Sequence, residues 1–283
     1  MKTERCFAND LLHYDISEND DEEMTFAPHC HDWYEVYCFL GGRVEFRVEG
    51  SVYRPNPGDV LLLDRTRFHS AQTFIGQAGG YRRAVMSFSA ELLRPDEQLL
   101  LAPFRVNAVR CPNAWEKGLK EAFEILEQAA QAPAAVRDIA IRAQAVTILA
   151  QLFAISQGAV GPQSTHAQTE QVLAYINANL TQPLTLEGLA GQFYLSRNSL
   201  ARSFKRATGT TVGEYILYKR MALARILLRS GHPAGVVARE CGFADYSTFY
   251  RSYCKVFGQS PAAPIVPEES PRLTALAPTP EAR

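Results

Sequence analysis

Four side chains in the first quarter of the chain have the chemistry of metal ligands: His29, His31, Glu35 and His69. Imidazole nitrogens combined with a carboxylate oxygen suit Zn, Fe, Mn or Ni. The first three have odd numbers, so an extended strand would point them to one face and Cys30 to the other. His69 lies near the start of a later strand and could join them in a metal site.

The same face could instead line a pocket for an organic effector. Trp33 and Tyr37 continue the odd-numbered series, and together with Phe39 they could form the stacking wall of a sugar site. The predicted effector pocket contains His29, His31, Trp33, Glu35, Tyr37 and His69. A third interpretation is a hydrogen-bonded cluster that only supports the fold, and the sequence leaves all three open.

Two segments near the carboxy terminus, 186–205 and 234–253, share one layout. Each has a short apolar helix, a tight turn, a polar N-cap and a second helix, the caps being Ser196 and Asp245. The capped helices leave Arg, Asn, Ser and Thr exposed near their amino-terminal ends. A recognition helix presents such side chains to base edges in the major groove, so the pattern predicts two helix-turn-helix units.

A longer helix is expected to join the two units. Thr211 and Glu214 fit a capping box at its start, Gly231 fits its end, and Pro233 begins the next helix. About seventeen helical residues span ~26 Å, which is stiff enough to fix one unit relative to the other.

Composition indicates a soluble protein of two domains. The 283 residues are 47% hydrophobic and 21% charged, with no continuous apolar run near the ~20 residues of a membrane helix. Residues 1–10 lack a signal-peptide core, so we expect a cytoplasmic protein with no membrane partner. The six cysteines are scattered and are expected to be reduced thiols.

Charge divides the chain. Residues 168–261 hold eleven Lys or Arg against five Asp or Glu, although the whole chain has a net charge of −1. A basic carboxy-terminal part suggests a polyanionic partner.

The hydrophobic period changes along the chain. Residues 26–90 read as short strands, with alternation at 44–48 and buried runs at 60–63 and 83–88, which predicts a small antiparallel barrel or jelly roll. Helical spacing follows over 115–131 and again from Pro133. These two helices could pack on the barrel or pair with a second subunit.

The expected fold class is therefore α+β with two domains: an amino-terminal antiparallel β-barrel followed by two helices, and an all-α carboxy-terminal domain. The expected boundaries are 1–157 for the barrel and its helices, 158–167 for a linker, 168–262 for the helical domain, and 263–283 for a disordered tail.

The helical domain resembles the DNA-binding domain of the AraC/XylS family of transcription regulators over about 95 residues. The matching motifs are Thr185-Leu186, Leu189-Ala190, Ser196-x-x-x-Leu200-x-Arg202-x-Phe204-Lys205, Gly209, Tyr215, Arg220-Met221-x-x-Ala224-x-x-Leu227-Leu228, Val237-Ala238, Gly242-Phe243-x-Asp245-x-Ser247-x-Phe249-x-Arg251 and Gly258-Gln-Ser-Pro261. The resemblance implies seven helices and two recognition helices that enter successive major grooves. It also implies double-stranded DNA and RNA polymerase as partners and no enzymatic activity.

Carried over by position, the resemblance implies base-reading residues Asn198, Ala201, Arg202, Ser247, Thr248 and Arg251. Ala201 offers only a methyl contact. The implied phosphate contacts are Lys205, Arg220 and Lys255, which would supply affinity rather than sequence choice. In one departure from the family, Gly235 weakens the helix that contains it by roughly 1 kcal/mol relative to alanine.

The amino-terminal domain resembles the first half of a cupin barrel through His29-x-His31-x-x-x-Glu35, Gly41-Gly42 and Pro57-x-Asp59, with His69 displaced from the position favoured by metal-binding cupins. Sensory domains of AraC-type regulators carry a similar stretch without metal. We therefore expect a homodimeric, effector-responsive, sequence-specific DNA-binding regulator. The alternatives are a cupin-type metalloprotein or metalloenzyme with an accessory helical domain, and a sequence-blind architectural DNA binder.

Overall fold

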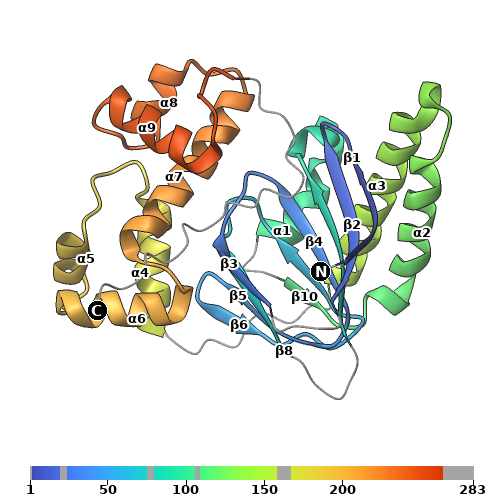
Figure 1. The fold of residues 1–283 in the computed structure, drawn as a ribbon, viewed down its shortest axis with the longest axis horizontal. Helices are drawn as coiled ribbons and strands as arrows, with labels where there is room; N and C mark the ends of the chain where they lie inside the picture. Colours follow the sequence, from blue (N-terminus) through green and yellow to red (C-terminus); the bar gives the residue numbers. More distant parts are fainter. Residues whose placement is uncertain (1, 20–23, 75–79, 106–108, 158–166, 264–283) are drawn as a thin grey trace.

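The computed structural model describes residues 2–19, 24–74, 80–105, 109–157 and 167–263, which form a β-rich part and a helical part side by side (Figure 1). This arrangement confirms the predicted fold class. The predicted linker at 158–167 and tail at 263–283 lie outside the described residues except for Ala167 and Ala263.

The amino-terminal part consists of two antiparallel sheets. One has the strand order β1-β2-β9-β4-β7-β10 and the other has the order β3-β8-β5-β6. The strands are β1 (Lys2–Ala8), β2 (Leu12–Asn19), β3 (Thr25–His29), β4 (Tyr34–Gly41), β5 (Arg43–Val48), β6 (Ser51–Tyr53), β7 (Val60–Leu63), β8 (His69–Phe74), β9 (Tyr81–Phe88) and β10 (Val109–Cys111). The sequence prediction began at residue 26 and missed β1 and β2, although Leu12, Tyr14 and Ile16 alternate as a strand should.

The six-stranded sheet is buried on both faces. Along β4, Val36 and Cys38 face a core shared with helices, whereas Tyr37 and Phe39 face the four-stranded sheet. This period of two follows from strand geometry. Strand β7, Val60–Leu63, is apolar at every position because both of its faces are covered.

Helices α2 (Leu119–Ala130) and α3 (Ala134–Ser156) form an antiparallel pair that covers the outer face of the six-stranded sheet (Figure 1). Pro133 precedes α3 as predicted. Shorter helical segments connect the last strands to this pair. Between β9 and β10 lie η1 (Ala90–Leu92), η2 (Pro95–Leu101) and α1 (Ala102–Arg105), and between β10 and α2 lies η3 (Trp115–Lys117).

By length and composition, α3 could cross a membrane, with a mean hydropathy of 1.6 over an 18-residue window. The sequence prediction had found no such run. Of that 18-residue window 28% is buried, and one side of α3 packs against α2 and the sheet through Ile141, Ile148 and Leu152.

The helical part contains α4 (Ala167–Ala178), α5 (Leu186–Gln192), α6 (Arg197–Thr208), α7 (Val212–Arg229), α8 (Ala234–Glu240) and α9 (Tyr246–Phe257). Six of the seven helices implied by the resemblance are thus among the described residues. The side chains of Ser196 and Asp245 accept hydrogen bonds from the backbone N–H groups of Ser199 and Thr248, which confirms both predicted caps. Thr211 and Glu214 form the predicted capping box of α7.

The two helix-turn-helix units use the same backbone turn with different residues. Tyr194 follows α5 with a φ of 55°, and Gly242 occupies the equivalent place after α8 with a φ of 75°. A Cβ at Gly242 would lie 2.9 Å from the carbonyl oxygens of Leu180 and Thr181. Glycine is therefore required in the second turn, while the exposed Tyr194 tolerates the left-handed conformation at some cost.

The two parts of the chain are joined by a buried ion pair. The tight turn between β5 and β6 consists of Glu49 and Gly50, both with positive φ. The carboxylate of Glu49 accepts hydrogen bonds from Lys219 Nζ at 2.9 Å, from the hydroxyl of Tyr215 and from the backbone N–H of Phe68. Since Tyr215 and Lys219 belong to α7, this helix docks on the β-rich part through the ion pair.

A second buried contact lies toward the carboxyl end of α7. Asp32 is 3.1 Å from a guanidinium nitrogen of Arg229 and 3.7 Å from one of Arg225. The guanidinium of Arg229 also lies over the ring of Trp33. Together the two contacts hold α7 along its length.

Two glycine substitutions in the second unit should shift stability in opposite directions. Gly242→Ala should destabilise by about 2 kcal/mol or more, because it combines positive φ with overlap of two carbonyl oxygens. Gly235→Ala, in open space on α8, should stabilise by up to ~1 kcal/mol. Urea unfolding of the full chain measures both, and equal effects would contradict the assigned turn.

Removing one partner of the buried ion pair should also be costly. Lys219→Met leaves Glu49 buried without its counter-charge and should lower the free energy of unfolding by about 3–5 kcal/mol. The double variant Glu49→Gln, Lys219→Met should recover much of this loss, and a double variant as unstable as Lys219→Met would argue against the pairing.

The same pair predicts a pH dependence. Burial alone would raise the pKa of Glu49, but the charge of Lys219 and three hydrogen bonds outweigh it and lower the pKa below its ordinary value. The stabilisation is therefore complete above the ordinary pKa of glutamate and is lost as pH falls through the lowered value. Thermal unfolding across acidic pH should show a steeper loss for the parent than for Glu49→Gln.

Candidate nucleic-acid interface and histidine cluster

Helix α6 presents a polar face to solvent. Its buried side consists of Leu200 and Phe204, which pack in the core of the helical part. Asn198 and Arg202 are exposed one turn apart, and Ala201 is half-buried beside them. The structure thus places the predicted base-reading residues of the first unit on one accessible face.

Helix α9 has the same design. Ser247, Thr248 and Arg251 are all exposed on its amino-terminal half. The Thr248 hydroxyl donates to the capping carboxylate of Asp245 at 2.9 Å and accepts from Arg251 at 3.4 Å. Thr248 therefore also stabilises the start of α9. It holds Arg251 close to the amino-terminal end of the helix, which is the end that contacts bases in known recognition helices.

The three predicted phosphate contacts do not share one environment. Lys205 and Lys255 are exposed, as a phosphate contact requires. Arg220 is instead turned inward, donating to the carbonyl oxygens of Leu180 at 2.8 Å and Gln182 at 2.7 Å. Burial lowers its pKa, and its guanidinium links α7 to the chain after α4, so its geometry fits a structural role better than the predicted phosphate contact.

The sequence analysis missed two tyrosines on α9. Tyr246 and Tyr250 are one helical turn apart and are both partly exposed, which is unusual for large aromatic side chains. Their spacing of four residues at the start of the recognition helix was a signal that could have been used.

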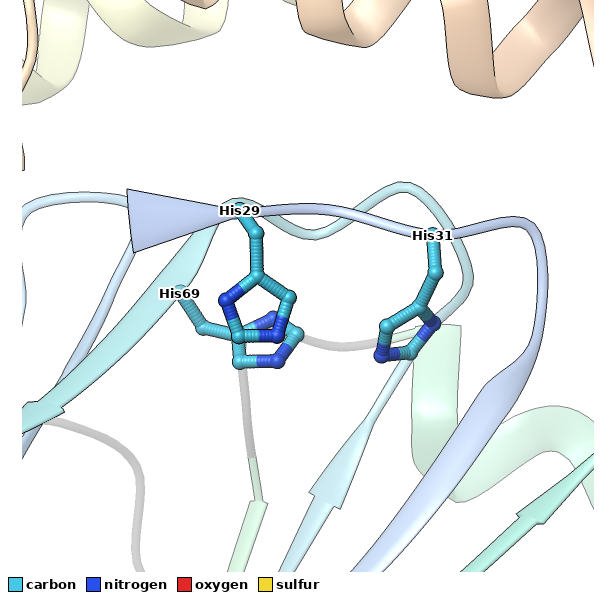
Figure 2. A group of neighbouring side chains, drawn as sticks. All are labelled: His29, His31 and His69. Carbon is cyan, nitrogen blue, oxygen red and sulfur yellow. The ribbon is translucent and has the colours of Figure 1, made fainter. Parts of the chain in front are cut away.

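Three histidines gather at one end of the β-rich part. His29 ends β3, His69 begins β8, and His31 lies in the bend between β3 and β4. Their ligating nitrogens all lie within 4.8 Å of one another, and the three rings project to the same side of the chain (Figure 2). This part of the predicted metal site is brought together by the fold.

Each histidine is oriented in the same way. The Nδ1 atoms of His29, His31 and His69 lie 2.8, 2.9 and 2.8 Å from the backbone carbonyl oxygens of Ala27, Trp33 and Arg67. An N–H on Nδ1 donates to each carbonyl, which leaves the Nε2 atoms directed at the shared space.

Glu35 completes the cluster. Its Oε2 lies 2.9 Å from Nε2 of His31 and 3.7 Å from Nε2 of His69. Burial would raise the pKa of this carboxyl, but the hydrogen bond from His31 and the neighbouring imidazoles lower it to about 2. Glu35 is therefore ionised, as a ligand or a counter-charge must be.

Burial acts to lower the pKa of all three imidazoles, but the net shift differs among them. It lowers the pKa of His29 to about 3, with help from the two neighbouring histidines, and it also lowers the pKa of His69. At His31 burial acts in the same direction, but the hydrogen bond and charge of Glu35 outweigh it and raise the pKa. His29 and His69 are thus neutral near pH 7.

The predicted effector pocket is only partly assembled. The chain bends between β3 and β4, so 29–37 is not one extended strand and the parity argument fails at Trp33. Trp33 lies instead at the contact with α7, below Arg229. Tyr37 faces the interior between the sheets, where its hydroxyl is 2.9 Å from that of Tyr81, and the predicted aromatic wall is therefore divided.

A cavity that the sequence analysis did not predict lies between the six-stranded sheet and α2. It has a volume of about 410 Å³, and its lining is both aromatic and charged, including Tyr14, Trp115, Arg82, Lys120 and Glu124. By contrast, the described space between the two sheets is filled by aromatic and aliphatic side chains, among them Tyr37 and Phe46.

Comparison with known proteins places both parts in families. Residues 13–159 match the model of the AraC-like ligand binding domain, and residues 189–263 match the model of a helix-turn-helix domain. A solved structure of apo ToxT from Vibrio cholerae aligns with 89% of this chain and 96% of its own, at 12% identity and a TM-score of 0.41.

Two curated relatives span nearly the whole chain. The Msm operon regulatory protein of Streptococcus mutans is 24% identical over 89% of this chain and 93% of its own length. The HTH-type transcriptional activator RhaS of Salmonella arizonae is 27% identical over 84% of this chain and 87% of its own. With a ligand-binding family model over residues 13–159 and a helix-turn-helix model after it, the chain belongs to the AraC family of transcriptional regulators.

Proposed function

We propose that this regulator reads a specific DNA sequence with α6 and α9, and that a small molecule bound in the amino-terminal domain controls this activity. The observation that carries the proposal is the exposed polar face on each of two helices that lie toward opposite ends of α7 (Figure 1). The 18 residues of α7 span ~27 Å, which is comparable to the ~34 Å between successive major grooves on one side of DNA.

The base-reading set is proposed to be Asn198, Ala201, Arg202, Ser247, Thr248 and Arg251, with Lys205 and Lys255 on phosphates. Polar side chains capable of base-edge hydrogen bonds would serve no purpose in a sequence-blind architectural protein. We add Tyr246 and Tyr250 as contacts to the sugar-phosphate backbone of the DNA, because both side chains are exposed on α9.

A sugar effector was one prediction, but Trp33 is separated from the aromatic side chains between the sheets. The cavity beside α2 offers an aromatic ring, Trp115, next to charged groups such as Arg82 and Glu124, which is a composition suited to a polar organic molecule.

We also propose that the protein acts as a homodimer in the cytoplasm, where it contacts RNA polymerase without being an enzyme itself. The support for dimerisation is that α2 and α3 each carry a large exposed apolar side chain, Ile125 at 50% on α2 and Ile139 at 71% on α3. An interface between two copies would remove these side chains from water.

The DNA-reading surface can be tested after selecting a preferred duplex from random sequences with the parent protein. Arg202→Ala and Arg251→Ala should each weaken binding to that duplex by about 1–3 kcal/mol and broaden the selected sequence. Fluorescence anisotropy at fixed salt, with selected and random duplexes, measures the loss of specificity.

Matched controls separate reading from affinity. Lys205→Ala should weaken binding to both duplexes alike and reduce the salt slope by about 1, whereas Arg54→Ala, at an exposed position on the other domain, should change neither. If both arginine variants kept the affinity and the sequence preference of the parent, the assigned helices would be wrong.

The dimer face can be tested by charge insertion. Ile139→Asp should shift the protein toward monomer in sedimentation velocity, because a desolvated carboxylate is unfavourable at an apolar interface. Leu99→Asp is the control, since Leu99 is similarly exposed at 58% but lies on η2. A dimer that persists in Ile139→Asp, or is lost equally in Leu99→Asp, would refute this interface.

A further inference from the structure

We propose that a divalent transition-metal ion bound by His29, His31 and His69, with Glu35 as fourth ligand, is an effector of this regulator and acts through the residues adjoining the histidines that contact the DNA-binding domain. This inference rests on the proposed function, because it names the chemical class of an effector. The metal site itself can be tested without DNA.

The donor set fits such an ion. Three imidazole nitrogens and one carboxylate oxygen are the ligands of Zn²⁺ and of its first-row neighbours, whereas Ca²⁺ and Mg²⁺ prefer oxygen alone. The nitrogens are within 4.8 Å of one another, and Glu35 Oε2 lies between two of them. Figure 2 shows the three rings on one side of the chain, facing a common space.

The surroundings are also those of a metal site. Each histidine uses Nδ1 on a backbone carbonyl, which fixes the ring. Nε2 of His31 bonds to Glu35 in this structure and would exchange that contact for the ion. A purely structural cluster explains His31, which is paired with Glu35, but not His29. Nε2 of His29 makes no hydrogen bond to any residue that the structure describes, yet its ring lies 4.2 Å from that of His69.

Each histidine adjoins a contact with the DNA-binding domain. Pro28, before His29, packs against Gly209 at the end of recognition helix α6, where a Cβ would approach Pro28 to 2.8 Å. Phe68, before His69, packs its ring 5.0 Å from that of Tyr215 on α7.

The third histidine follows the same rule. Asp32, directly after His31, is the carboxylate that pairs with Arg225 and Arg229 near the other end of α7. The backbone carbonyl of His31 also accepts a hydrogen bond of 2.6 Å from Thr66, whose own carbonyl accepts from Lys219. All three ligand segments therefore lie between the proposed ion and the helices that carry the readers.

Coordination would contract the cluster. Bonds of ~2.0–2.1 Å to a tetrahedral ion place ligand nitrogens ~3.4 Å apart, which is closer than the 4.8 Å within which they now lie. The contraction would draw β8 and the β3–β4 bend together. Because Pro28, Asp32 and Phe68 are their immediate neighbours, the docking of α6 and α7 would change with metal binding, as an effector requires.

The first experiment measures binding alone. Full-length protein stripped of metal is titrated with Co²⁺ and then Zn²⁺, following the absorption of tetrahedral cobalt and the heat of binding. We expect one ion per chain, with affinity reduced at least ~10-fold in His29→Gln and in His69→Gln. His232→Gln, which alters an exposed histidine, is the control and should bind as the parent does.

The outcomes are distinct. No bound ion at micromolar concentration, or unchanged binding in both His29→Gln and His69→Gln, overturns the metal site. Circular dichroism and thermal unfolding establish that the variants are folded. Should either variant fail to fold, Glu35→Gln serves in its place and should weaken cobalt binding while retaining the fold.

The second experiment tests the coupling. Zn²⁺ should change the affinity of the parent for its selected duplex by about 5-fold or more. Phe68→Leu should bind Co²⁺ like the parent but lose much of this change, because its contact with Tyr215 is altered. Equal DNA affinity with and without Zn²⁺ overturns the effector role while leaving the metal site supported. A protein that binds cobalt at the histidines but selects no DNA sequence refutes the proposed function instead.

Discussion

The relation between the two domains depends on one carboxylate that is buried away from water. Glu49 stands in a tight turn where its own backbone has a positive φ of 48°, a conformation that asparagine or glycine would adopt more readily. The position is explained by what the side chain reaches: an ammonium group and a phenol, both on α7, and the backbone N–H of Phe68. Strain in the turn is thus offset by groups that compensate a desolvated charge at that point.

Docking through a charged pair also makes the interface specific. An apolar patch could slide along α7, but an ion pair at Lys219 and another at Arg229 fix both the rotation and the axial position of the helix. Cys30 and Phe68 fill the space between them and belong to the same core as the helical domain. The amino-terminal domain consequently supplies part of the core on which the DNA-binding domain packs.

The local patterns in the sequence were sufficient for most of the fold. Caps at Ser196 and Asp245, the capping box at Thr211 and the alternation in 44–48 each depend on residues close together in the chain, and each was confirmed. Local patterns are silent where distant residues decide the environment of a side chain. Arg220 resembles a free surface cation until its contacts with the carbonyls of Leu180 and Gln182 are known.

The candidate site shows the same division. The meeting of three histidines and one carboxylate was predictable, because their residue types and spacing are those of a metal or pocket site. The residues are His29, His31, Glu35 and His69. The position of Trp33 was not, because the chain leaves β3 before it enters β4 and the alternation of side chains is interrupted. Likewise, nothing local marks Glu49 or Lys219 as partners that lie 170 residues apart.

One feature of α7 has a consequence for the DNA rather than for the protein. A single uninterrupted helix joins the two helix-turn-helix units and also bears the docking contacts, so the units cannot be moved independently of each other. The two short base sequences that they are proposed to read must then keep a constant phase on the double helix. Inserting half a turn of duplex between the two base sequences would place one of them on the opposite face of the DNA, where a unit fixed by a straight α7 would not reach it.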